Sequence, residues 1–201
     1  MVGLFVSVFL GIGLSAAAGF RVFLPLFGVS LATYMGWWTA PPDMLWAGSL
    51  PALVLFGTAC VVELAAYYIP IIDHLLDTIA APSAVVAGTV LTACALSHNE
   101  ISPIVQWAAA LIVGGTTAGL VSGGTAAVRV GSTALTGGLG NPVVSTVEVG
   151  SSLLLTVLAI IVPVFTGVAV LVLLFFAANL LRQRWLRWRK PTVPTDELAE
   201  L

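Results

Sequence analysis

Long apolar stretches dominate the sequence, and short polar segments separate them. Four apolar blocks occupy residues 2–38, 48–69, 83–97 and 103–136, and a fifth runs from 143 to 181. A helix needs about 20 apolar residues to cross the ~30 Å hydrocarbon core of a bilayer. The first and last blocks are much longer than this, so each predicts two helices instead of one straight span.

Proline and glycine mark the positions where the two longest blocks are expected to break. Gly19 and Pro25 interrupt the first block, and Pro163 and Gly167 interrupt the last one. Proline removes a backbone hydrogen bond from a helix and is a common cause of kinks. The pattern therefore predicts an all-α, polytopic helical membrane protein of about six spans, with five to seven allowed, that contains broken or re-entrant helices.

Residues 70–82 lie between two apolar blocks and contain Asp73, His74 and Asp77. Asp73 and Asp77 are four residues apart and share one face of a helix, while apolar residues cover the opposite face. The segment predicts a short amphipathic helix at the membrane interface. Two carboxylates and an imidazole can bind a divalent cation or relay protons, and a solvated helix face is the alternative.

The composition supports a membrane protein and restricts its partners. Hydrophobic residues make up 59% of the 201 residues and charged residues only 8%, whereas soluble domains carry about 25% charged residues. Five of the seven basic residues lie between Arg182 and Lys190, so we expect a cytoplasmic C-terminus and no nucleic-acid partner. We expect one transmembrane domain over residues 1–181, and a basic juxtamembrane segment with a short tail over 182–201.

Hydroxyl side chains surround two charged residues within the apolar blocks. One helical face around Arg129 contains Ser122, Thr125, Ser132, Thr133 and Thr136. The face around Glu148 contains Asn141, Ser145, Ser151, Ser152 and Thr156. The two stripes predict the polar wall of a cavity, and small packing residues that bond to their own backbone are the alternative.

A glycine-rich turn at residues 137–142 separates the two stripes. Arg129 precedes the turn by eight residues and Glu148 follows Asn141 by seven, so antiparallel helices place both charges about 10–12 Å from the turn. A lone charge at the bilayer centre costs at least ~2.5–3.5 kcal/mol. We therefore predict a salt bridge between Arg129 and Glu148.

Arg21 and Glu63 repeat the order of Arg and then Glu in the first half of the chain. The helical face next to Arg21 offers no local counter-charge, which leaves Glu63 or Glu148 as its partner. This repeated order indicates an inverted repeat of the kind that builds transporters. Coincidence is the alternative, because the Arg-to-Glu separations differ, at 42 and 19 residues.

Small residues recur at every fourth position in two of the apolar blocks. The larger ridge consists of Gly115, Gly119, Gly123, Ala127 and Gly131, and Gly11, Ser15 and Gly19 form a shorter one. Such ridges let helices approach closely in lipid. We expect the protein to be a homo-oligomer.

Three motifs resemble those of a known family. They are the segment Ala17–Leu26 around Arg21, Glu63 followed by the segment Ile69–Asp77, and the segment Gly138–Glu148. Together they are similar to the bacterial and plastid integral-membrane family catalogued as domain of unknown function 4126, over about residues 5–180. The resemblance implies a multi-spanning protein, with the bacterial inner membrane as its location, and it supplies no activity.

We expect a small transporter or channel for a small polar or anionic solute, with proton coupling left open. Arg21 and Arg129 would face the solute, Glu63 and Glu148 would pair with them or carry protons, and Asn141 with Ser145 would complete the site. The alternative is a structural, assembly or lipid-interacting protein with static ion pairs.

An enzyme that uses the polar residues of segment 70–82 has the least support, because the sequence contains no nucleophile or oxyanion motif. Cys60 and Cys94 are too few for a disulfide framework or a four-ligand zinc site. We expect no cofactor.

Overall fold

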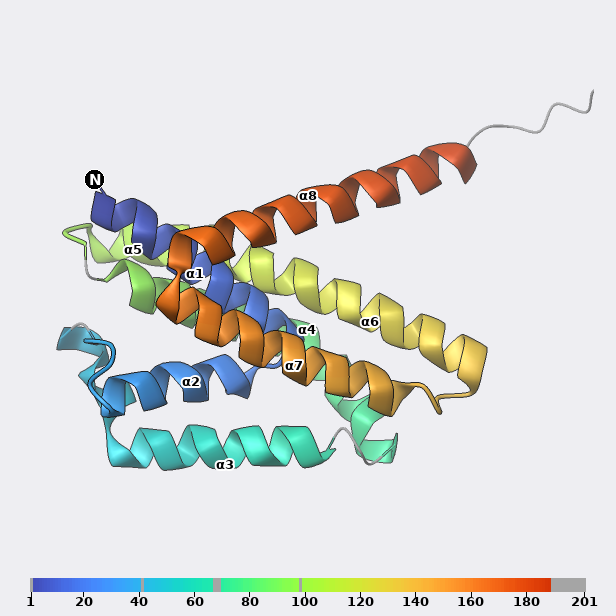
Figure 1. Cartoon of the computed structure of the whole chain (residues 1–201), viewed down its shortest axis with the longest axis horizontal. Helices are drawn as coiled ribbons and strands as arrows, with labels where there is room; N and C mark the ends of the chain where they lie inside the picture. Colours follow the sequence, from blue (N-terminus) through green and yellow to red (C-terminus); the bar gives the residue numbers. More distant parts are fainter. Residues whose placement is uncertain (1, 41, 67–69, 98, 189–201) are drawn as a thin grey trace, which may run out of the picture. The chain divides into compact units, whose positions relative to one another are not determined.

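The computed structural model describes residues 2–40, 42–66, 70–97 and 99–188, which form helices and turns with no strand among them. The α-helices are α1 (Val2–Phe20), α2 (Phe23–Tyr34), α3 (Leu50–Ala66), α4 (Pro70–Leu96), α5 (Pro103–Ala110), α6 (Thr116–Thr136), α7 (Asn141–Ile161) and α8 (Pro163–Trp188) (Figure 1), and a 3-10 helix, Pro42–Gly48, lies between α2 and α3. A π-helical segment, Leu111–Gly115, joins α5 to α6 without a break. The predicted all-α class is confirmed.

Within the described residues, five helical segments are long and apolar enough to cross a membrane. They are α1, the part of α4 from Thr78 onward, the continuous α5–α6 helix, α7 and α8. The apolar helices α2 and α3 are shorter, with 12 and 17 residues, or about 18 and 26 Å of helix. The chain is therefore a polytopic helical membrane protein, and α2 is too short to span a bilayer alone.

Both predicted helix breaks are present. The first apolar block divides at Arg21 and Val22, between α1 and α2, and the last block divides at Val162, directly before α8. Pro163 occupies the first position of α8, where its missing N–H group leaves no helical hydrogen bond unmade.

The prediction of a separate short helix at residues 70–82 is wrong. This segment is the first half of α4, a 27-residue helix that contains Pro82 in its interior. Membrane helices tolerate an internal proline because neighbouring groups can satisfy the carbonyl that it leaves without a partner. The side chains of Asp73, His74 and Asp77 lie outside the described residues, so their metal or proton role stays a prediction.

The chain divides into two units, residues 1–170 and 171–201, and every described candidate site residue lies in the first. In this unit α1 packs against α4, α6 and α7. Close packing depends on small residues: the Ser15 hydroxyl donates to the Gly88 carbonyl of α4 at 2.8 Å, and a Cβ on Gly114 would lie only 2.4 Å from the same oxygen. The backbones of α1 and of the segment Leu111–Gly115 approach α4 closely for this reason.

The larger glycine ridge is used over only part of its length. Gly115 and Gly119 pack against Val85 of α4, whereas a Cβ placed on Gly123 or Gly131 would meet nothing within 4 Å. The first part of the ridge therefore packs inside the bundle, and the rest has no close neighbour in the described chain.

Candidate functional site

The α6–α7 hairpin places two charged helix faces opposite each other. Gly137 ends α6 with a positive φ of 64°, and Gly138 follows with a φ of 91°, a backbone conformation that favours glycine. Beside this turn, the Asn141 side-chain amide donates to the Thr133 hydroxyl at 3.2 Å. The predicted turn is confirmed, and it fixes the register between the two helices.

Arg129 and Glu148 form the predicted ion pair across this hairpin. Arg129 Nε donates to Glu148 Oε1 at 3.0 Å, and Nη2 donates to Oε2. Arg129 Nη2 also donates to the Ser145 hydroxyl at 3.1 Å. Both charged residues are buried, with exposed fractions of 4% and 3%. The contact is bidentate, which is the strongest arrangement for an arginine and a carboxylate.

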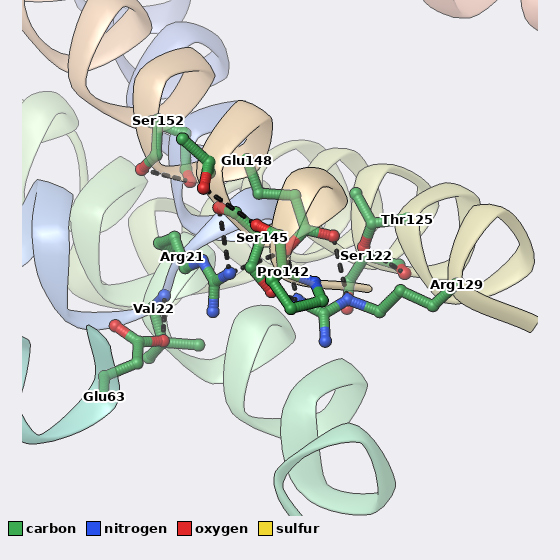
Figure 2. A network of polar contacts seen from close by, with 12 residues as sticks. Arg21, Val22, Glu63, Ser122, Thr125, Arg129, Pro142, Ser145, Glu148 and Ser152 are labelled. Carbon is green, nitrogen blue, oxygen red and sulfur yellow. Dashed lines mark hydrogen bonds and ion pairs between the residues drawn. The ribbon is translucent and has the colours of Figure 1, made fainter. Parts of the chain in front are cut away.

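Arg21 approaches the same carboxylate from the break after α1. Its Nη2 lies 2.9 Å from Glu148 Oε2 and donates to the Ser145 carbonyl at 3.2 Å. Figure 2 shows the two guanidinium groups on either side of Ser145 and Glu148. Glu148 is thus a salt-bridge partner of Arg21, and its carboxylate forms salt bridges with two arginines. Arg21, Glu148 and Arg129 are called the Arg–Glu–Arg cluster below.

Glu63 of α3 contacts the backbone at the start of α2. Its Oε1 accepts the Val22 N–H at 2.9 Å, and its Oε2 accepts the Phe23 N–H at 3.0 Å (Figure 2). The first N–H groups of a helix have no partner within the helix, and the N-terminus carries a partial positive charge. The Glu63 carboxylate therefore caps α2 from another helix.

A cavity of about 30 Å³ lies beside these groups, and we call it the inner cavity. Its described lining includes Glu63, Ser122, Thr125, Arg129 and Glu148. One water molecule needs about 10–15 Å³ of such space and two to four polar partners. The inner cavity is therefore large enough for about two water molecules and polar enough to hold them.

The hydroxyl stripes serve more than one purpose. Ser122 and Thr125 line the inner cavity, and the Thr125 hydroxyl donates to the Ser122 carbonyl at 2.9 Å. Ser152 is fully buried and donates to the Ala17 carbonyl of α1 at 2.9 Å. Ser132 and Ser151 are half-buried and are not among the described lining residues. Part of the Arg129 stripe therefore borders the cavity, whereas the hydroxyl side chains of the Glu148 stripe are not among the described lining residues.

The sequence alone did not identify the backbone groups of this site. Val22 and Phe23 contribute N–H groups, and their apolar side chains gave no sign of this role. The available signal was the expected break between Gly19 and Pro25, because a helix that begins there exposes N–H donors. The alanines of α4 that line the inner cavity, such as Ala80, were missed because their side chains carry no polar group.

No group of three His, Cys, Asp or Glu side chains that could bind a metal ion occurs among the residues described.

The fold and these contacts define a polytopic helical membrane protein with buried Arg and Glu side chains in shared ion pairs. The chain matches the family described as Domain of unknown function (DUF4126) over residues 8–183, and it belongs to that family. No curated protein and no solved structure matches it.

Proposed function

We propose that this protein is a small membrane transporter or channel for a small anionic or polar solute. The observation that supports this most is the Arg–Glu–Arg cluster, in which two guanidinium groups share one carboxylate beside the inner cavity. A simple pair needs only one arginine, whereas two guanidinium groups contact this carboxylate. Ionisable residues inside membrane bundles commonly mark solute or proton pathways.

The broken α1–α2 helix supports the same proposal. Transporters commonly bind solutes where a helix is interrupted, because the interruption exposes backbone groups and the charge of a helix terminus. Here the break lies at Arg21 and Val22, next to the cluster. Glu63 offsets the positive N-terminus of α2, so the guanidinium groups of the cluster are the groups that would attract an anion at this site.

Flux measurements on purified protein in liposomes test the proposal. We expect efflux of chloride, nitrate or acetate above that of protein-free liposomes, and no comparable efflux of K⁺. A pH gradient imposed across the same liposomes tests proton coupling. If anion transport is coupled to protons, the gradient should change the anion flux. Absence of anion, proton and uncharged polar solute flux, with and without the gradient, would contradict the proposal.

Conservative arginine variants link the flux to the cluster. Arg129→Lys keeps the positive charge but loses the planar fork that contacts both carboxylate oxygens. We expect the flux to fall about tenfold or more, the factor that corresponds to ~1.4 kcal/mol. Glu100→Gln is the matched control because Glu100 is exposed on a turn and lies outside the cluster. Equal flux in the two variants would show that transport does not depend on Arg129.

A structural or assembly role is the second candidate, and one observation favours it. The carboxylate of Glu148 accepts hydrogen bonds from three donor groups of two arginines, and the inner cavity has room for only about two water molecules. On this alternative the cluster stabilises the bundle and carries nothing. Arginine variants would then lower the melting temperature of the protein, and liposomes with the unmodified protein would show no flux.

A further inference from the structure

Glu63 also lines a second and larger cavity. It measures about 190 Å³ and lies among α2, α3 and α4. Its lining is mainly apolar, with Phe23, Val62 and Ile79 among the contributors and Ser83 as a polar residue. We call it the outer cavity. It is several times larger than the inner cavity beside the arginines.

The two cavities share part of their walls. Val22, Glu63 and Ala80 line both of them. Ala80 has only a methyl group, and Val22 contributes the N–H group that the Glu63 carboxylate accepts at 2.9 Å. Glu63 is therefore the one long, charged side chain that the two described linings share.

Helix α3, which carries Glu63, lies at the edge of the first unit. It runs beside α2 (Figure 1), packs mainly against that helix and has few contacts with the described part of α4. Only Ala52, Cys60, Glu63 and Ala66 are buried along its length. Apolar packing provides little driving force for helix association in lipid, so the two hydrogen bonds of Glu63 are a principal link between α3 and the helix break.

We infer that Glu63 is a gate between the outer and inner cavities. While its carboxylate caps α2, the Arg–Glu–Arg cluster is closed off from the outer cavity. When the side chain leaves the Val22 and Phe23 N–H groups, the two cavities join into one passage that ends at Arg129. The purpose of this passage, delivery of an anionic solute to the arginines, rests on the proposed function. The closure itself depends only on the geometry of α3 and the break.

Cysteine labelling tests the gate without a flux measurement. Ser122, on the inner cavity wall, is replaced by cysteine in a chain that also carries Cys60→Ala and Cys94→Ala. The probe is an anionic methanethiosulfonate reagent, and the measured quantity is the rate of thiol modification. We expect Glu63→Ala to increase this rate at least about tenfold, the factor expected for the loss of one or more charge-assisted hydrogen bonds.

Glu63→Gln provides a second, milder variant with the same shape. Its amide has a single oxygen, so one of the two backbone contacts is lost and the modification rate should rise by a smaller factor. Glu100→Gln is the control for loss of a carboxylate and should leave the rate unchanged. Size-exclusion chromatography establishes that each variant is monodisperse before it is labelled.

The outcomes separate the gate from the proposed function. Faster thiol modification in the Glu63 variants, together with no solute flux from liposomes, would reject transport and support the gate. Measurable anion flux with unchanged labelling in both variants would overturn the gate alone. If neither Glu63 variant is monodisperse, Glu63 is required for folding, and the gate is likewise overturned.

Discussion

Glu63 and Glu148 are both buried carboxylates, and the chain stabilises them in opposite ways. Glu148, on α7, accepts hydrogen bonds from the guanidinium groups of Arg21 and Arg129. Glu63, on α3, accepts hydrogen bonds from the backbone N–H groups of Val22 and Phe23. One carboxylate thus contacts two fully charged side chains, and the other faces the partial charge of a helix terminus.

The difference determines how easily each carboxylate can leave its place. Removal of Glu148 would take away a carboxylate that two buried guanidinium groups contact, and breaking a buried ion pair in this way is costly. Removal of Glu63 would expose two neutral N–H groups, which water in the adjacent cavities can satisfy. Glu148 therefore suits a permanent structural centre, and Glu63 suits a group that moves.

The largest effect should come from Glu148→Gln. Breaking a buried ion pair by removing one partner typically costs ~3–5 kcal/mol, whereas Glu63→Gln should cost ~1–3 kcal/mol, as expected for a lost hydrogen bond to a charged group. The melting temperature of each variant in detergent, followed by the loss of monodisperse protein, measures the difference. Equal losses in the two variants would remove the distinction between a fixed and a movable carboxylate.

The ion pair that the sequence predicted is the one whose geometry is local. Arg129 and Glu148 lie 19 residues apart in one hairpin, and the glycine turn fixes the register between their helices, so counting residues from the turn was sufficient. Arg21 is 127 residues from Glu148. Spacing does not determine which helices pack together over that distance, so the sequence left Glu63 and Glu148 as equal candidates.

The helix breaks were predictable to a similar extent. Pro163 lies at the expected break, and the division at Val22 falls between the expected Gly19 and Pro25. Pro82 gave the opposite result, because α4 continues through it. Sequence position alone does not show whether neighbouring helices can satisfy the backbone that a proline disrupts.

A smaller effect is expected from exchanging the charges of Arg129 and Glu148. The double variant Arg129→Glu, Glu148→Arg preserves the hairpin pair, but it places the new guanidinium group next to Arg21, which lies 2.9 Å from the present carboxylate. Rescue should therefore be incomplete, with ~1–3 kcal/mol of stability still missing relative to the unmodified protein. Melting temperatures of the double variant and of the two single variants test this.

Full rescue in the exchange experiment would mean that Arg21 does not depend on Glu148. The comparison would then change, because Glu148 would act only in a simple pair with Arg129. Failure of the double variant to improve on Glu148→Arg alone would indicate the reverse, that the shared contact with Arg21 outweighs the hairpin pair.

The smallest effect should come from Ser152→Ala. The Ser152 hydroxyl bonds to the Ala17 carbonyl and so connects the helix of Glu148 to the end of α1, one turn before Arg21. One neutral hydrogen bond contributes about 1 kcal/mol, which corresponds to a decrease in melting temperature of ~2–4 °C for a chain of this size. Ser151→Ala, at the half-buried neighbouring position, is the control and should change the melting temperature less. The bond contacts the helix of Glu148 and not that of Glu63, so Ser152→Ala should leave the rate of thiol modification at Ser122→Cys unchanged. A faster rate would show that the two carboxylates are coupled.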